Sequence, residues 1–442
     1  MSSGRDDAGR PFTIYLDNAA TSRPFPEAVE AVGRAMEHGY GNPSSRHGLG
    51  LAASRLVEAA RTTLARAIGA EAREIVFTGG GSEANNLALK GAAWAYTRAG
   101  RHLVVSAVEH PSVLEAARWL ADEADLAVTY VPVGRDGLVD PLAVTAAVNE
   151  QTVLVSLMHV NNEVGSVQPV GEVGRRLRAP RATSGRRKGL PLFHVDAVQS
   201  LGRLPIDVRS WGADLLTVSA HKVHGPKGVG ALFVRNGVRL TPLVHGGGHE
   251  AGRRSGTENV PGIAGFGAAL ARLAGLDLAA NARRLSELRR RFIEAVRAAF
   301  SRPGLGGPDG LGRGVPGGEV VVNGPEDDTA VAGHIISLSF PGVPAEVLQH
   351  HLEERGVYVS TGSACSSHHQ ERASHVLVAM GCPPAVVASA VRVSLAPLAA
   401  EDEVLEAGRI IGEVAGRLAA GGPSRVGGGP SGPPGERRGR PS

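Results

Sequence analysis

The chain has 442 residues, a formal net charge of +4 at pH 7 and only two cysteines, Cys365 and Cys382. This length is more than one hydrophobic core usually organises, so we expect two domains, and two cysteines exclude a disulfide framework and fit a reducing cytoplasm. Residues 1–10 are polar and no run of about 18 apolar residues occurs, so the sequence predicts neither a signal peptide nor a membrane-spanning helix.

Up to about residue 265, short strand-forming runs alternate with helical patterns. We expect helices at 26–38, 46–68, 83–98, 110–123, 141–148 and 170–177, and strands at 74–77, 102–106, 127–131, 153–159, 193–196, 215–219 and 231–234. Strands that alternate with helices form a mainly parallel sheet with helices on both faces, and ligands bind at the carboxyl ends of its strands. The predicted fold class is therefore α/β, with a large domain over residues 24–265 built on a seven-stranded sheet.

From residue 266 the pattern changes. One long amphipathic helix is expected at about 265–300, then a glycine-rich surface loop at 304–318, strands at 320–322, 334–340 and 390–395, and helices at 345–355 and 401–418. We interpret residues 266–420, together with 12–23, as a smaller α+β domain. Residues 1–11 and the basic tail 421–442 are expected to be disordered, because they have too few apolar side chains to offset the entropy of ordering.

Basic residues gather in the segment 175–188 and in the C-terminal tail. Such charge could attract nucleic acid or an acidic protein, and a solvated insertion is the alternative. No aromatic residues interleave with these charges, so a stacking platform for single strands is missing and we do not expect a nucleic-acid partner.

Lys222 stands just after the strand 215–219, in the run Ser219-Ala-His-Lys. A rigidly held amine beside hydroxyl and imidazole groups is what covalent attachment of pyridoxal phosphate needs. Asp196 ends the preceding strand and can pair with the protonated ring nitrogen of that cofactor, and Gln199 follows it. A solvated loop lysine is the alternative, but the register of these motifs favours a cofactor site.

A glycine turn leads from the strand 74–77 into a helix at Gly79-Gly-Gly-Ser82. Free N–H groups at a helix N-terminus bind phosphate, Ser82 adds a hydroxyl group, and Gly81 lets the backbone approach. A capped helix after a glycine turn is the alternative.

His110 and an asparagine pair also follow predicted strands. A flat imidazole at position 110 could stack on the cofactor ring and carry protons, unless it only caps its helix. Either Asn161 or Asn162 could donate to the ring oxygen, and their spacing does not decide between them.

Cys365 lies among small polar residues and histidines, which suits an exposed nucleophilic thiolate, and an inert small residue is the alternative. Arg392 is costly to bury without a partner, which could be a substrate carboxylate or an internal carboxylate. We predict no resident metal site, and Cys365 is the candidate ligand for an iron–sulfur cluster in transit.

Together these motifs resemble those of the NifS/IscS-type cysteine desulfurases, which are class V aminotransferases of fold type I. The motifs that carry the resemblance lie at 15–21, 41–45, 77–86, 109–110, 159–163, 194–200, 219–222, 245–250, 254–257, 362–365 and 392–394. The resemblance implies removal of sulfur from L-cysteine, giving L-alanine and a persulfide for an acceptor protein in iron–sulfur cluster assembly or thiolation.

The resemblance also implies a role for each matching residue. Lys222 would bond to the cofactor and move the substrate α-proton, His110 would stack on the ring and assist proton transfer, and Cys365 would attack the substrate sulfur. The remaining roles are Asp196 at the ring nitrogen, Gln199 and Asn162 at the ring oxygen, Gly81, Ser82, Ser219 and His221 at the phosphate, Thr257 at the phosphate of the other subunit of a homodimer, and Arg392 with Asn42 at the substrate carboxylate.

Two other activities remain open at this point. The histidines that follow Cys365 resemble the loop of selenocysteine lyases, which share the fold and the cysteine. A class V aminotransferase in which Cys365 is idle is the second alternative.

Overall fold

The computed structural model describes residues 13–179, 189–301, 319–361 and 373–421. The predictions for both chain ends, for the glycine-rich loop 304–318 and for Cys365 lie outside these ranges, as does most of the basic segment 175–188.

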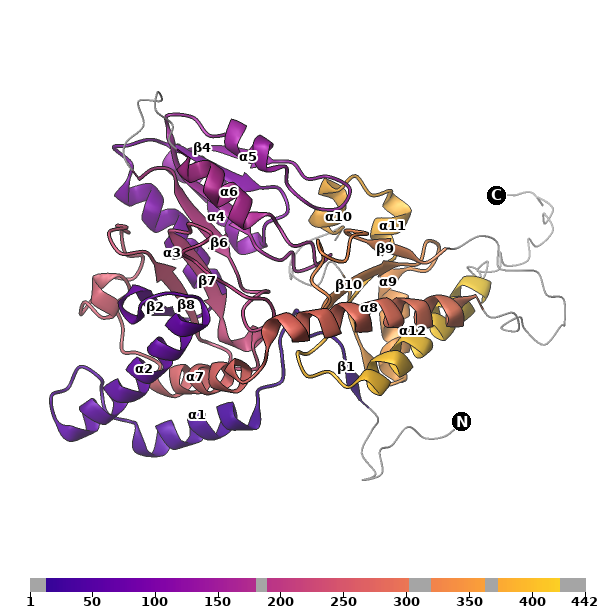
Figure 1. Ribbon diagram of the computed structural model, residues 1–442, viewed down its shortest axis with the longest axis horizontal. Coiled ribbons are helices and arrows are strands. Elements are labelled where there is room, and N and C mark those ends of the chain that lie inside the picture. Colours follow the sequence, from indigo (N-terminus) through magenta and orange to yellow (C-terminus); the bar gives the residue numbers. More distant parts are fainter. Residues whose placement is uncertain (1–12, 180–188, 302–318, 362–372, 422–442) are drawn as a thin grey trace, which may run out of the picture.

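A seven-stranded sheet forms the larger part of the molecule (Figure 1). Its order is β2 (Ile75–Thr78), β8 (Gly230–Val234), β7 (Leu215–Ser219), β6 (Leu192–Asp196), β5 (Thr152–Met158), β3 (His102–Ser106) and β4 (Ala127–Val131). All neighbouring strands are parallel except β8, which is antiparallel to β2 and β7. The predicted mainly parallel α/β sheet is confirmed, and its strands are apolar runs because both faces are buried.

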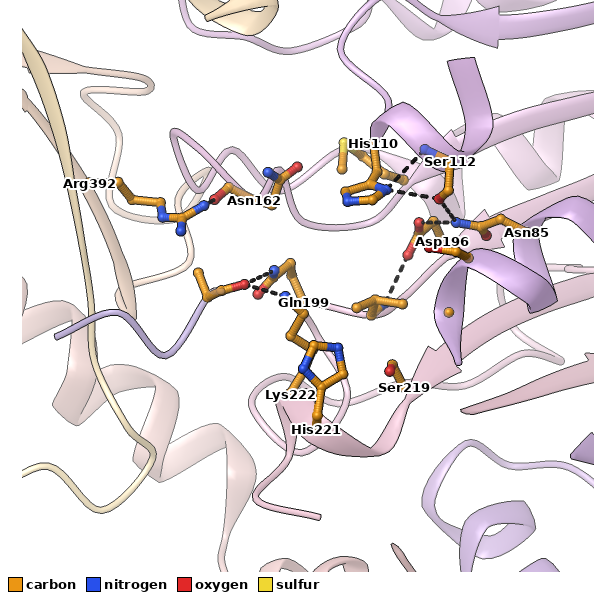
Figure 2. A pocket seen from close by; sticks show the side chains of 15 residues that line it. Asn85, His110, Ser112, Asn162, Asp196, Gln199, Ser219, His221, Lys222 and Arg392 are labelled. Carbon is orange, nitrogen blue, oxygen red and sulfur yellow. Dashed lines mark hydrogen bonds between the residues drawn. The ribbon is translucent and has the colours of Figure 1, made fainter. Parts of the chain in front are cut away.

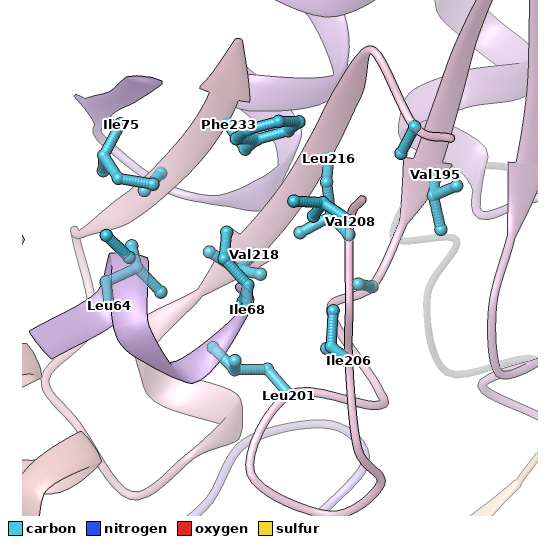
Figure 3. Close-up of a cluster of buried hydrophobic side chains, with 14 of the residues drawn as sticks. Leu64, Ile68, Ile75, Val195, Leu201, Ile206, Val208, Leu216, Val218 and Phe233 are labelled. Carbon is cyan, nitrogen blue, oxygen red and sulfur yellow. The ribbon is translucent and has the colours of Figure 1, made fainter. Parts of the chain in front are cut away.

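Helices cover both faces of this sheet. They are α1 (Pro26–His38), α2 (Gly48–Ala67), α3 (Gly81–Ala95), α4 (Pro111–Ala124), α5 (Pro141–Ala146), α6 (Val170–Arg178) and α7 (Val260–Ala274), with short 3₁₀ turns η1 (Ala72–Glu74), η2 (Ala220–Lys222) and η3 (Glu250–Gly252). The side chains of α3 and α4 share a core with one face of the sheet, and those of α2, α6 and α7 with the other. Figure 3 shows Leu64 of α2 and Ile68, which follows that helix, in one core with Val218 and Phe233.

The second part of the molecule has its own core. A four-stranded antiparallel sheet has the order β12 (Ser360–Thr361), β13 (Ala390–Ser394), β10 (Ile335–Ser339) and β9 (Val321–Asn323), and β1 (Ile14–Tyr15) pairs in parallel with β11 (Val357–Tyr358). Its helices are α8 (Leu278–Phe300), α9 (Ala345–Glu354), α10 (His375–Ala379), α11 (Pro384–Ala388) and α12 (Glu401–Gly421). Ile14 and Leu16 join this core, so the start of the described chain packs against residues more than 300 positions away.

The prediction of one helix over about 265–300 is wrong. The chain breaks between α7 and α8 with a bend of 81°, because Gly275 follows α7 and Asp277 caps α8 by accepting a hydrogen bond from Ala280 N. Leu273 of α7 packs in the core of the large sheet and Leu285 of α8 in the second core. The chain therefore passes from one core to the other at this break.

In the described ranges, no single helix has both the length and the apolar character needed to cross a bilayer, and α7 and α8 meet that criterion only when they are joined across their bend.

Candidate active site

A pocket with a volume of about 210 Å³ opens at the carboxyl ends of the sheet strands (Figure 2). Most of the residues singled out in the sequence line it together: Gly81, Ser82, His110, Asn162, Asp196, Gln199, Ser219, His221, Lys222 and Arg392. The topology explains this meeting, because β2, β3, β5, β6 and β7 run in one direction and end at one edge of the sheet.

The turn between β2 and α3 forms one wall of the pocket. Gly81 and Ser82 begin the 15-residue helix α3, whose first N–H groups have no partner within the helix. A Cβ atom on Gly230 of β8 would lie 2.5 Å from the carbonyl carbon of Gly80. Glycine at position 230 therefore lets the turn pack against β8, and the helix N-terminus is held at the pocket.

Asp196 ends β6 with both carboxylate oxygens bonded. Oδ1 accepts from Val198 N at 3.0 Å, and Oδ2 accepts from Asn85 Nδ2 at 2.8 Å. These bonds hold the carboxylate in one orientation at the pocket.

His110 caps α4, and its Nδ1 accepts from Ser112 N at 3.1 Å. Burial lowers the pKa of His110. The Asp196 carboxylate opposes this effect, and the positive charges of Lys222 and His375 add to it. His110 is therefore neutral at pH 7.

The structure separates the two asparagines that the sequence left open. The Asn161 side chain is bonded to backbone atoms of two loops: it donates to Val108 O of the loop after β3 at 3.0 Å and accepts from Glu163 N and Val164 N of its own loop. Asn162 lines the pocket instead, and its buried Oδ1 has no partner in the described chain.

Lys222 and Gln199 both contact the N-terminal segment that follows β1. Lys222 Nζ donates to Ala19 O and, at 2.7 Å, to Ala20 O, and Gln199 Nε2 donates to Ala19 O at 2.9 Å. Ala19 N in turn donates to Ser394 Oγ of β13 at 2.8 Å. This segment joins the two cores beside the lysine.

Arg392 reaches the pocket from β13 and is already paired. Its Nη2 donates to Asp17 Oδ1 at 2.9 Å and its Nη1 to Asn162 O at 2.9 Å, while its buried Nε has no partner among the described residues. The internal carboxylate that the sequence left open is therefore present, and these two bonds use two of the five guanidinium N–H groups.

Two predicted residues, Asn42 and Thr257, are not in this pocket. Asn42 is exposed and its side chain accepts from Ser44 N at 2.9 Å. Thr257 is exposed in the loop before α7. Cys365 lies outside the described residues.

The Aminotransferase class-V family model matches residues 14–302. The chain belongs to the class-V aminotransferase family.

Known class-V proteins resemble this chain over most of its length. The cysteine desulfurase IscS of Dictyoglomus turgidum is 41% identical over 382 residues, which are 86% of this chain and 89% of that protein. A solved NifS-like protein superposes with a TM-score of 0.79 at 34% identity and covers 91% of this chain and 99% of its own. The solved structure of SspA in complex with cysteine gives a TM-score of 0.70 at 32% identity, with 87% and 99% covered.

This class-V chain is a pyridoxal phosphate-dependent enzyme, and the pocket fits that cofactor. Among its lining residues, the side-chain atoms Ser219 Oγ, Asn162 Oδ1 and Asn85 Oδ1 are buried without a partner in the described chain. Buried polar groups without partners are costly, so these atoms are suited to a polar ligand. Burial and the nearby Lys222, Lys227 and His110 lower the pKa of His221 to about 4, which leaves a neutral imidazole in the wall of the pocket.

The sequence analysis did not predict a group of residues that connects α10 to the loops of the pocket by hydrogen bonds. Ser374 Oγ donates to Glu163 Oε2, and His375 Nε2 donates to Glu109 O at 3.0 Å. Glu163 and Glu109 are both buried. The sequence signal was present, because both acids are next to predicted site residues, but their partners lie more than 200 positions away.

Proposed function

We propose that this protein is a cysteine desulfurase. It takes the sulfur atom of L-cysteine, leaves L-alanine and holds the sulfur as a persulfide on Cys365. The observation that carries the proposal is the meeting of Lys222, Asp196 and Arg392 in one pocket, where several buried polar side-chain atoms have no partner among the described residues.

Each residue has a part that its position supports. Lys222 holds the cofactor, Asp196 pairs with its ring nitrogen, and the α3 N-terminus with Ser219 holds its phosphate. Pyridoxal phosphate, when bound, withdraws electrons from the substrate carbon next to the amine. Arg392 binds the substrate carboxylate through guanidinium N–H groups that its bonds to Asp17 and to Asn162 O leave unused.

Sulfur transfer balances with one thiol and no further oxidant. The Cys365 thiolate forms a bond to the substrate sulfur while the bond from that sulfur to the β-carbon breaks. The electron pair of the broken bond stays on carbon, and a proton completes the methyl group of alanine. One cysteine and one thiol therefore give one alanine and one persulfide.

The two cysteines provide a matched test. Burial raises the pKa of the Cys382 thiol, so it is a poor nucleophile at neutral pH. We expect the holoenzyme and Cys382→Ala to form alanine from L-cysteine and to gain one sulfur atom in intact-protein mass spectra. Cys365→Ala should form neither product. Alanine formation by Cys365→Ala would show that Cys365 takes no part in the reaction. Faster turnover of L-selenocysteine than of L-cysteine by the holoenzyme would favour a selenocysteine lyase.

We further propose a cytoplasmic homodimer that passes the persulfide sulfur to an acceptor protein of iron–sulfur cluster assembly or thiolation. The exposed Thr257 supports the dimer, because a phosphate-binding role for it needs a second subunit. The low cysteine content supports a reducing compartment.

A further inference from the structure

Two polar side chains without an assigned role, Asn85 and Ser112, lie between Asp196 and His110 (Figure 2). Asn85 belongs to α3 and Ser112 to the first turn of α4. Both helices pack on one face of the large sheet, which brings the two side chains together. Asn85 is only 1% exposed, so its hydrogen bonds are shielded from water.

Short hydrogen bonds connect the four residues in series. Asn85 Nδ2 lies 2.8 Å from Asp196 Oδ2 and 2.8 Å from Ser112 Oγ. Ser112 Oγ lies 2.8 Å from His110 Nδ1. Figure 2 shows this series on one side of the pocket, with the edge of the His110 ring opposite Ser112 facing the pocket.

The series determines where each hydrogen lies. The Asn85 amide nitrogen has two hydrogens, one for Asp196 and one for Ser112 Oγ. Ser112 Oγ accepts from Asn85, so its own hydrogen is available to His110 Nδ1. The backbone N–H of Ser112 also donates to Nδ1, at 3.1 Å. Nδ1 therefore carries no hydrogen, and the neutral ring carries its hydrogen on Nε2.

We propose that Asn85 and Ser112 are positioning residues that hold His110 as a neutral imidazole with Nε2–H as a hydrogen-bond donor toward the ligand. The inference rests on the proposed function and adds to it. An Nε2 atom that already carries hydrogen cannot accept the substrate α-proton, so that proton goes to Lys222. His110 orients the reacting group through a hydrogen bond.

The same bonds affect the titration of His110. Donors to Nδ1 stabilise the neutral ring and so lower its pKa. The titratable groups that act on His110 are Asp196 of β6, Lys222 of η2 and His375 of α10, and His221 of η2 also interacts with it. These four groups remain in place when Ser112 changes, so a Ser112 variant isolates the hydroxyl group.

The test reads the tautomer directly. Apoenzyme labelled with ¹⁵N-histidine is titrated by NMR, and His110→Gln identifies the His110 signals. We expect wild type to show Nε2–H and an Nδ1 without hydrogen. Ser112→Ala should titrate about 0.5 to 1 pH unit higher, because about 1 kcal/mol of hydrogen bonding to the neutral ring is lost. Ser112→Thr keeps the hydroxyl group and should restore the wild-type titration, and the exposed Ser210→Ala is the control.

Kinetics of the holoenzyme provide a second measurement. In Ser112→Ala the acidic limb of the kcat/KM profile should move to higher pH with KM for L-cysteine unchanged, and Ser112→Thr should restore it. An Nδ1–H signal in wild-type apoenzyme, or identical titrations of wild type and Ser112→Ala, would overturn the inference. The NMR measurement needs no turnover, so absence of alanine formation would count against the proposed function alone.

Discussion

Glu109 is a fully buried carboxyl group beside the catalytic pocket. Its Oε1 accepts from Met158 N at 2.7 Å, and its Oε2 has no partner among the described residues. Burial raises the pKa of Glu109 to about 8, with a further contribution from Asp196. The folded protein therefore keeps this proton to higher pH than the unfolded chain does.

Glu109→Gln tests this consequence. A carboxyl group whose pKa is raised by folding makes the folded state lose stability as pH rises from its unfolded pKa toward 8. Glutamine keeps an acceptor for Met158 N and cannot ionise. Between pH 5 and 8 the variant should lose less stability than wild type, by up to about 4 kcal/mol. Denaturant unfolding at both pH values measures the difference. Equal losses in both proteins would contradict it, and Glu115→Gln, an exposed glutamate of α4, is the control.

Arg392→Lys tests the substrate contact. A lysine can keep the charge near Asp17 but loses the planar fork that binds a carboxylate with two hydrogen bonds. We expect KM for L-cysteine to rise about tenfold with little change in kcat. Arg289→Lys, at a buried arginine paired with Asp328, is the control. If Arg392→Lys has an unchanged KM and a lower free energy of unfolding, then Arg392 serves only the internal contact with Asp17.

At the scale of elements, the short helix α10 is held in place by both apolar packing and hydrogen bonds. Val376 and Leu377 pack with Val108 and Val164 from the loops of the large sheet. Ser374 caps the helix by accepting from Leu377 N at 3.1 Å and also donates to the buried Glu163. The helix that follows the Cys365 segment is thus docked on the loops that carry His110 and Asn162.

Ser374→Ala should weaken this docking. The variant loses a helix cap and leaves a buried carboxyl oxygen without its donor, so we expect the free energy of unfolding to fall by about 1 to 3 kcal/mol. Ser389→Ala is the control, because among the described residues the Ser389 hydroxyl bonds only to the adjacent helix α11, donating to Ala385 O at 2.7 Å. Equal losses in the two variants would show that the contact with Glu163 adds nothing.

At the scale of the whole molecule, the position of Thr257 predicts a dimer. Thr257 is exposed and lies outside the pocket of its own subunit. Light scattering should give about twice the 45.6 kDa chain mass. Thr257→Ala should lower cofactor affinity several-fold by loss of one hydrogen bond to phosphate, and the exposed Thr329→Ala is the control. A wild-type mass equal to one chain would contradict the dimer. A Thr257→Ala variant that binds the cofactor as tightly as wild type would contradict the role of Thr257.

The large sheet and most of the pocket could be predicted from sequence for a physical reason. Buried parallel strands are apolar runs, and residues just after them meet at one edge, so Asp196, Ser219 and Lys222 could be placed without coordinates. Asn85 and Ser112 could not, because their roles depend on how α3 and α4 pack. The two-residue β1 was missed because it depends on a partner strand far along the chain, and the break at Gly275 was missed because it depends on a single helix cap.

The most direct test of the account is the site of cofactor attachment. Borohydride reduction of the holoenzyme, followed by peptide mass mapping, should find the reduced cofactor on Lys222. Wild type treated with L-cysteine just before reduction should show less of this label. A label on another lysine, or no label on a holoenzyme that forms alanine, would contradict the central claim that Lys222 holds the cofactor in this pocket.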